Sequence, residues 1–341
     1  MPIVQSRRHL LTNIALAGAT GFAGLSVASL YGGRKSAAAQ PPPEVSTIRI
    51  DAGPILCVAP EFVADSLLHA EGFTEIRYDD SDKAPVQKLA DNVVDWILEF
   101  APTVITESDG GVPVTMVSGV HAGCFELFAQ EHIHSVAGLK GRTVGVAPSH
   151  VTPRSLVSIM ASYVGLNPET DIHWIRDPSP RLMQRFIDGN IDAFLTSAPR
   201  AQELRARGIG HSLVNSATDR PWSQYYCCML TGRTEFIRKY PVATKRVLRA
   251  ILKGADLCAA EPERTAQLLV DQGRTARYDY ALQALNELSY KVWRDYDPED
   301  TVRWYALRLN EGGFIRSAPD DVIASRTDWR FLNQVKRELR V

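Results

Sequence analysis

The stretch that decides the fold is GLKGRTVGV at residues 138–146, where a turn flanked by glycines leads into a short β-type run. It opens a second series of alternating strand-like and helix-like segments, and a first series with the same rhythm starts at Ser46. A βαβ rhythm is typical of a mostly parallel sheet with helices on its faces. Two such series are too alike to belong to one sheet, so the sequence predicts an α/β chain with two lobes.

Short β-type runs mark the expected strands. In the first lobe they lie at residues 47–50, 75–78, 94–98 and 113–117, and in the second at 143–146, 172–175, 193–195 and 209–214. Expected helices lie between them at residues 62–70, 86–90, 153–164, 180–188 and 199–207. The tail from residue 236 to residue 341 is predicted to be helical, since residues 242–260 and 262–272 show apolar side chains at helical spacing.

Length and composition describe a globular protein of moderate charge. The 341 residues are 45% hydrophobic and 23% charged, enough for two ordinary domains or one two-lobed unit. The formal net charge is −1, but residues 1–39 hold four of the basic side chains and no acid, which leaves 34 basic against 39 acidic side chains in the body. Nucleic-acid binding normally needs a basic stripe, so we expect no nucleic-acid partner.

The N-terminal segment has the anatomy of an export signal. Arg7 and Arg8 precede a long uncharged stretch, and small residues ending at Ala39 offer a cleavage site. The paired arginines and the modest hydrophobicity resemble a twin-arginine signal. The alternative is a membrane anchor, because the stretch is long enough to span a bilayer, although many glycines dilute its apolar content. We expect residues 1–39 to be a cleaved signal peptide, residues 40–45 a Pro-rich linker, and the body to be periplasmic.

The five cysteines, at positions 57, 124, 227, 228 and 258, form no recognisable disulfide framework. An odd count in a chain of this size favours small buried side chains over a stapled scaffold. The adjacent Cys227 and Cys228 cannot bridge each other without strain.

Residues 131–134 have the sequence EHIH, which places two histidines two residues apart in a turn. A closed metal site needs three or four ligands, and no further ligand is near them in the sequence. We expect a solvated loop there, and neither a metal nor a cofactor.

Four expected helices begin with a proline directly after a strand, at Ala59-Pro60, Ala101-Pro102, Thr152-Pro153 and Ala198-Pro199. Proline is favoured at the first helical position, where its missing N–H costs nothing. Ligands of open α/β sheets lie beyond the carboxyl ends of the strands, where free N–H groups of helix starts suit an anion or an oxygen-rich molecule. Ordinary capping explains any single start equally well. The small and hydroxyl residues predicted to contact ligand there are Ala59, Thr103, Ser149, Thr152, Thr196 and Ser197.

Three motifs in order along the chain resemble those of one family. The run LKGRTVGV at residues 139–146 is similar to the segment that opens the second lobe in many transporter-associated binding proteins. GVPV at 111–114 and GNIDAF at 189–194 are similar to their G-x-P-V and G-x-I-D-A strands. Together they resemble the nitrate/sulfonate/taurine branch of ABC-transporter solute-binding proteins, which is related to proteins that bind thiamine-pyrimidine precursors. The similarity covers nearly all of residues 46–260.

The resemblance implies a type II periplasmic-binding-protein fold, with two mostly parallel sheets joined by two crossing hinge strands. Lobe one would comprise residues 44–122 plus 228–341 and lobe two residues 123–227, with crossings at 125–128 and 224–227. It also implies a monomer without a cofactor, which closes on a small-molecule ligand and delivers it to an ABC permease in the inner membrane. The expected ligand is a small anionic or aromatic molecule of the sulfonate, nitrate, carboxylate or pyrimidine class.

Residues beside the crossings complete the predicted site. His121 could donate to a ligand oxygen or be a structural histidine, and the sequence leaves both open. Arg220 suits the paired oxygens of a carboxylate, sulfonate or phosphate, while Trp222 and Tyr225 could stack on a flat ligand. The alternative for this group is a packed hinge in which Arg220 pairs with a surface carboxylate.

Cys57 carries the enzymatic alternative. It follows the first strand, where a nucleophile would be exposed, and the fold also hosts desulfinases with a reactive cysteine in this loop. A Cys57-dependent, desulfinase-like hydrolase assisted by His121 is therefore a second hypothesis. The chain has no H-E-x-x-H, G-x-S-x-G, P-loop or G-x-G-x-x-G motif, which favours a binding protein in which Cys57 is a ligand contact.

Overall fold

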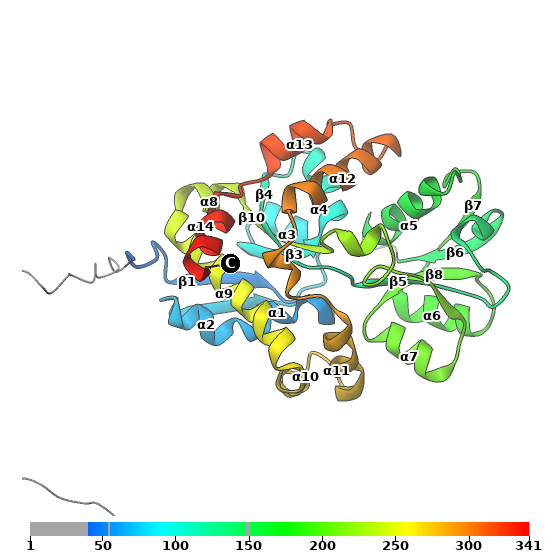
Figure 1. The fold of residues 1–341 in the computed structure, drawn as a ribbon, viewed down its shortest axis with the longest axis horizontal. Helices are drawn as coiled ribbons and strands as arrows, with labels where there is room; N and C mark the ends of the chain where they lie inside the picture. The colour runs from blue at the N-terminus through cyan, green and yellow to red at the C-terminus, as the bar shows by residue number, and fades with distance from the viewer. Residues whose placement is uncertain (1–39, 54, 148–150, 341) are drawn as a thin grey trace, which may run out of the picture. The chain divides into compact units, whose positions relative to one another are not determined.

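Two five-stranded sheets organise the residues that the computed structural model describes, which are 40–53, 55–147 and 151–340 (Figure 1). The predicted signal peptide lies outside these residues. Among the helices in these ranges, none combines the length and the apolarity needed to cross a membrane.

The first sheet has the strand order β2-β1-β3-β10-β4. Strand β1 is parallel to β2 and β3, whereas β10 is antiparallel to both of its neighbours. All eight residues of β4 are buried, and Ile48, Ile50 and Trp96 add fully buried side chains to the core. The strands are β1 (Thr47–Asp51), β2 (Glu75–Asp79), β3 (Trp96–Phe100), β4 (Val114–His121) and β10 (Cys228–Arg233).

The second sheet has the order β7-β6-β8-β5-β9. Strand β6 is parallel to β7 and β8, and β5 is antiparallel to β8 and β9. A small core of Phe128, Phe186 and Phe194 lies beneath it. The strands are β5 (Phe125–Ala129), β6 (Arg142–Val146), β7 (Ile172–Arg176), β8 (Ala193–Ser197) and β9 (His211–Asn215).

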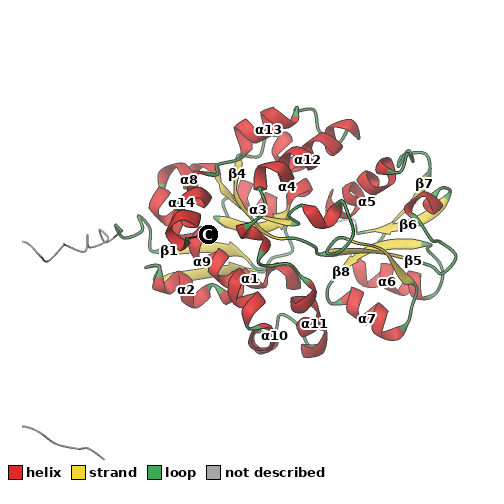
Figure 2. Cartoon of the chain, viewed as in Figure 1, coloured by secondary structure: helices red, strands yellow, loops and turns green. Residues whose placement is uncertain are grey.

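Helices pack on both sheets, and most of the chain after β10 is helical (Figure 2). Beside the first sheet they are α1 (Ala59–Val63), α2 (Asp65–Ala70), α3 (Pro85–Ala90) and α4 (Ala101–Asp109), with the short 3-10 turn η1 (Leu56–Val58) before α1. Beside the second sheet they are α5 (Val151–Tyr163), α6 (Ser179–Ile187) and α7 (Arg200–Arg207). The remaining helices are α8 (Thr234–Lys239), α9 (Pro241–Ala260), α10 (Pro262–Asp271), α11 (Tyr278–Glu287), α12 (Pro298–Glu311), α13 (Pro319–Arg326) and α14 (Arg330–Leu339).

Helix α9 fastens the predicted linker and α1 to the body. The Glu44 carboxylate accepts hydrogen bonds of 2.9 and 2.8 Å from the N–H groups of Val242 and Ala243, which a helix start otherwise leaves without partners. At Gly254 a Cβ atom would lie 2.6 Å from the carbonyl oxygen of Pro60, so glycine permits the close approach of α9 and α1. The linker is thus docked on the first lobe's helices rather than a free spacer.

The predicted fold class is confirmed. In each sheet four strands run one way and one strand, β10 or β5, runs the other way. All eight predicted strands are present with shifted ends, and β10 has no counterpart in the prediction.

Two local predictions are wrong. Residues 125–128 do not cross between the sheets, because β5 pairs with β8 along its whole length, and the chain instead crosses at residues 122–124 and 216–227. Pro60 and Pro102 lie in the first turns of α1 and α4 as predicted, whereas Pro199 precedes α7 and does not start it.

Candidate functional site

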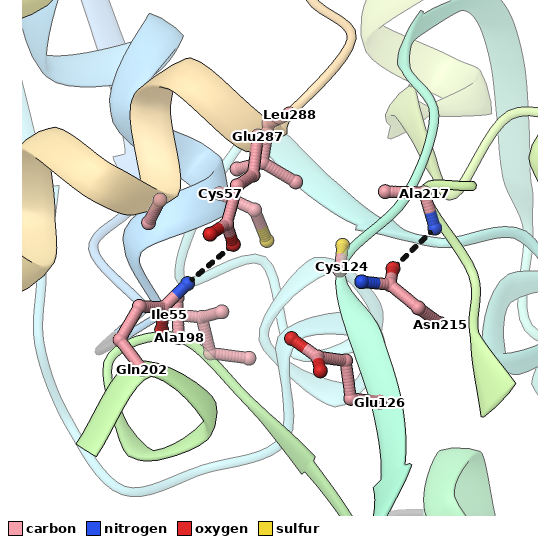
Figure 3. A pocket seen from close by; sticks show the side chains of 11 residues that line it. Ile55, Cys57, Cys124, Glu126, Ala198, Gln202, Asn215, Ala217, Glu287 and Leu288 are labelled. Carbon is pink, nitrogen blue, oxygen red and sulfur yellow. Dashed lines mark hydrogen bonds between the residues drawn. The ribbon is translucent and has the colours of Figure 1, made fainter. Parts of the chain in front are cut away.

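The carboxyl ends of strands from both sheets meet around a small cavity (Figure 3). Its volume is about 20 Å³, which is room for about one water molecule. One wall comes from η1 and α11, and the opposite wall from the first crossing, β5, α7 and the end of β9. The polar and sulfur-bearing residues that line it are Cys57, Cys124, Glu126, Gln202, Asn215 and Glu287.

Three cysteines and a histidine converge beside this cavity. Cys57 lies in η1 after β1, and Cys124 lies in the first crossing. His121 ends β4 and pairs with Cys228 at the start of β10. The three Sγ atoms and a ring nitrogen of His121 all lie within 4.8 Å of one another. We call Cys57, His121, Cys124 and Cys228 the thiol–imidazole cluster.

The cysteines differ in state. Cys124 forms a disulfide with Cys227, which the sequence did not indicate, while Cys57, Cys228 and Cys258 are buried free thiols, as predicted for most of the cysteines. The Cys228 thiol, and after it the His121 imidazole, lower the pKa of Cys57 to about 6, although burial acts the other way. Burial raises the pKa of Cys228 well above its usual range. Of the two thiols, Cys57 is therefore the one that ionises near neutral pH.

Carboxyl groups, rather than cations, accumulate at this edge of the first sheet. Glu61 is 1% exposed, and neither of its carboxyl oxygens has a hydrogen-bond partner among the described residues. Burial, and after it the neighbouring Asp51, hold the pKa of Glu61 well above its usual range, and burial raises the pKa of Glu99 to about 8. Within the part of the chain that the structure describes, the buried cation nearby is Lys88, which pairs with Asp51 at 2.7 Å and with Asp79 at 2.9 Å. This edge therefore carries neutral acids and a neutralised pair.

The second wall is joined to α11 by a charged contact. Arg205 of α7 pairs with Glu126 of β5 and, at 2.6 Å, with Glu287 of α11. Gln202 donates a further hydrogen bond of 3.0 Å to Glu287. Within the described residues, Glu126 Oε2 and Gln202 Oε1 are buried acceptors without a partner, and both side chains line the cavity. The site therefore offers hydrogen-bond acceptors to whatever enters it.

The residues predicted at helix starts lie around the two sheet edges. Ala59 and Thr103 are buried in the first turns of α1 and α4, and Thr196 and Ser197 end β8 next to the lining residue Ala198. Ser149 and the side chain of Thr152 lie outside the described residues. Cys57 and His121 come together in the thiol–imidazole cluster, as the enzymatic hypothesis expected of them.

The predicted aromatic group lies elsewhere. Trp222 packs edge-on against Trp304 of α12, and Tyr225 stacks on the same ring at 4.5 Å between centroids. Arg220 is exposed, and none of Arg220, Trp222 and Tyr225 lines the cavity. The two aromatic side chains are packed as in the hinge alternative, whereas no ion pair of Arg220 with a carboxylate is found among the described residues.

The EHIH loop holds no metal-type cluster among the described residues. His132 faces Asp192 at 3.3 Å, and His134 stacks on His211.

Sequence reasoning missed most of the polar lining. Glu126, Gln202, Asn215 and Glu287 come from a strand, a helix, a strand end and another helix, so no motif unites them. The one available signal was the placement of Asn215 at the end of a predicted strand of the second lobe, where ligand contacts are expected.

A family model matches residues 41–270 and is described as the NMT1-like family. The chain belongs to the NMT1-like family. The matched segment contains both sheets, both crossings and the whole thiol–imidazole cluster, and only the α11 part of the cavity wall lies beyond it.

One relative by sequence is the bicarbonate-binding protein CmpA of Synechococcus elongatus, which is 26% identical to this chain over 110 residues. These residues are 32% of this chain and 24% of CmpA, so the chain matches about a quarter of the curated relative's length.

Solved structures confirm the periplasmic-binding-protein fold of this NMT1-like chain. The nitrate-binding protein NrtA from Synechocystis PCC 6803 has a TM-score of 0.73 at 14% identity, covering 88% of this chain and 90% of NrtA. The alkanesulfonate-binding protein SsuA from Xanthomonas axonopodis pv. citri bound to MOPS has a TM-score of 0.65 at 14% identity, covering 80% and 95%. The desulfurization enzyme DSZB shares the fold as well, with a TM-score of 0.61 at 16% identity over 86% and 100%.

Proposed function

We propose that the protein is the solute-binding component of an ABC importer, which captures a small molecule between the facing edges of its two sheets. The observation that carries the proposal is the cavity itself, because its walls come from different sheets and from the carboxyl ends of their strands. In open α/β sheets this is where ligands bind. The relatives named for bicarbonate, nitrate and alkanesulfonate binding support the same function.

Ligand entry requires the walls to separate. A cavity of about 20 Å³ is far below the several hundred Å³ of ordinary ligand pockets. We therefore take this arrangement as the closed form, which hinge motion at residues 122–124 and 216–227 would open. A ligand favours closure by the difference between its affinities for the closed and open forms. The moving lobes would be residues 44–122 plus 228–341 and residues 123–227, in agreement with the strands that make up each sheet.

The described lining favours a ligand that donates hydrogen bonds. Glu126 Oε2 and Gln202 Oε1 are buried acceptors, and a buried acceptor without a hydrogen bond destabilises the folded protein. The cation beside them, Arg205, already pairs with two carboxylates. An amino-substituted ring of the pyrimidine class satisfies these acceptors, whereas nitrate and sulfonate offer only further acceptors. Among the expected ligand classes, we therefore place pyrimidines ahead of the anions.

The rest of the physiological setting follows from the function. We propose that the protein works as a periplasmic monomer, exported by its twin-arginine-type signal, and delivers the ligand unchanged to a permease in the inner membrane. The acidic body supports the absence of a nucleic-acid partner.

A thermal-shift screen of the full chain tests the proposal. The panel would contain aminopyrimidines, sulfonates, nitrate, bicarbonate and aromatic acids. A ligand at a hundred times its Kd stabilises the fold by about 2.7 kcal/mol, and we expect this for an aminopyrimidine that is recovered chemically unchanged. Recovery of a converted product would contradict the binding function, and a hit confined to anions would contradict the preference for hydrogen-bond donors.

The Cys57→Ala variant separates binding from the enzymatic alternative. Because the proposed contacts are made by Glu126 and Gln202, the variant should keep its ligand affinity within about threefold. A hydrolase that uses Cys57 as nucleophile would instead lose product formation entirely.

A further inference from the structure

The geometry of the thiol–imidazole cluster matches a tetrahedral metal site. In such a site metal–sulfur bonds are about 2.3 Å long, which places neighbouring sulfur atoms about 3.8 Å apart. The Sγ atoms of Cys124 and Cys228 are 3.8 Å apart, and all four ligand atoms lie within 4.8 Å of one another. Three cysteines and one histidine are also a common ligand set of structural zinc sites.

His121 supplies a second, independent observation. Its side chain is fully buried, and among the described residues the Cys57 thiol is the polar group beside its ring, while neither ring nitrogen has a hydrogen bond of ordinary geometry. A buried imidazole whose ring nitrogens are so poorly satisfied destabilises the folded protein unless another group binds it, and a metal ion is one such group. The ring is held in place by Tyr290, whose centroid lies 5.4 Å away.

The cluster also has an entry path. Cys57 and Cys124 line the cavity between the sheets, and Figure 3 shows their sulfur atoms facing the same space. An ion that enters the open cavity would reach these two ligands first, because His121 and Cys228 are not among the residues that line it.

We propose that the protein with its cysteines reduced binds one zinc-type divalent cation at the thiol–imidazole cluster. Binding would make three metal–thiolate bonds and one metal–imidazole bond and would release the thiol protons to solvent. The site goes beyond the proposed function, because it requires no particular ligand and no transporter.

The Cys124–Cys227 disulfide and the metal exclude each other, because Cys124 cannot serve both. A phosphine reductant such as tris(2-carboxyethyl)phosphine breaks the S–S bond and leaves two thiols. The phosphine takes an oxygen atom from water, becomes the phosphine oxide and supplies the two electrons, while the water supplies the two protons. Reoxidation of the two thiols by dioxygen, which takes up the two electrons and the two protons, would re-form the disulfide and release the metal.

The test is metal binding by the full chain after reduction with the phosphine and its removal without air. We expect one Zn²⁺ per chain by elemental analysis, and with Co²⁺ a thiolate-to-metal charge-transfer absorption typical of tetrahedral thiolate coordination. The air-oxidised protein should bind at least about 100-fold more weakly, since even changes outside the ligand shell cost 10–100-fold. Absence of both signals in the reduced protein would overturn the proposal.

Variants locate the ion. Cys227→Ser keeps all four ligands and removes the competing disulfide, so it should bind Zn²⁺ without any reductant. Cys57→Ser and Cys228→Ser should each lose at least about 100-fold in affinity when reduced. Cys258→Ser is the matched control, because Cys258 is a buried free thiol outside the cluster and its loss should leave binding unchanged. Undiminished binding by Cys57→Ser and Cys228→Ser would place the ion elsewhere and refute the assignment.

Discussion

Glu99 lies one residue before the end of β3, and burial raises the pKa of its carboxyl group to about 8. The unfolded chain ionises this group near 4.5, whereas the folded protein keeps it neutral. Stability contributed by Glu99 is therefore complete below about pH 4.5 and is lost progressively as the pH rises to about 8.

The variant Glu99→Gln should remove this loss. Compared with the parent, it should gain about 1–3 kcal/mol in unfolding free energy between pH 5 and pH 8, a range kept modest because Glu99 is partly accessible to water. Urea unfolding at several pH values measures the difference. For Glu311→Gln, a change at an exposed position, the unfolding free energy should depend on pH as it does in the parent. The same pH dependence in Glu99→Gln would show that Glu99 does not have a raised pKa in the folded protein.

Gly119 in β4 lies directly beneath the ring of Tyr226. A Cβ atom at Gly119 would overlap this ring, which is fixed because the Tyr226 hydroxyl donates to the carbonyls of Val292 and Tyr296. Gly119→Ala should destabilise the protein by about 1–3 kcal/mol or more through overpacking. In thermal unfolding, Gly138→Ala is the control, since its Cβ would meet only ordinary contacts. Equal melting temperatures for the two variants would contradict this account.

The contact between α7 and α11 is the element-level feature that we expect to stabilise the proposed closed form. Glu287→Gln removes the charge that pairs with Arg205, leaving this arginine to Glu126 alone. Because the pair is partly exposed, the expected loss is about 1 kcal/mol, which is about fivefold in ligand affinity. Amide hydrogen exchange should speed up in α7 and α11 together.

Glu203→Gln is the matched control for this contact. It removes a carboxylate that pairs with Arg207 on the exposed side of α7 and does not reach α11. Similar exchange rates in Glu203→Gln and Glu287→Gln would show that the Arg205 contact does not close the cavity.

Elements with regular patterns could be predicted from the sequence, and irregular ones could not. The strands β1, β2, β6 and β7 follow β-type runs and appear close to their predicted positions. Strand β10, with the sequence CMLTGR, has few β-branched residues and follows the crossing directly, so nothing local distinguishes it from a loop. Its pairing with β3 and β4 is decided by tertiary contacts.

At the level of the whole molecule, the Cys124–Cys227 disulfide ties the two crossings together over a sequence separation of 103 residues. Closing a loop of this length restricts the unfolded chain, and such bridges stabilise proteins by about 2–4 kcal/mol. Cys227→Ser should lose this amount in urea unfolding, and the reduced parent should match it. Because Cys258→Ser keeps the disulfide, its unfolding free energy should fall on reduction by the same amount as that of the parent. A reductant-insensitive parent would show that the bridge does not form in solution.

The sequence predicted residues at the edge where the candidate site lies, but not the composition of its lining. The rule that ligands lie beyond the carboxyl ends of strands led to Cys57 and Ser197, whereas the crossings were expected from the family resemblance. The thiol–imidazole cluster, by contrast, joins residues spread from position 57 to position 228, and only the fold brings them within 4.8 Å. Trp222 and Tyr225 show the opposite case, because they lie close together in the sequence and were predicted to contact ligand, but both pack against Trp304 of α12.

The central place of β10 sets an order of events for the newly made chain. The second sheet is encoded without interruption by residues 125–215, so it can assemble as soon as those residues are available. Among the described strands, β4 pairs with β10 alone, although all of its residues are buried in the finished protein. Until residue 233 has been synthesised, the first sheet keeps two open strand edges, at β3 and β4, which are the type of surface that chaperones protect and that aggregation exploits.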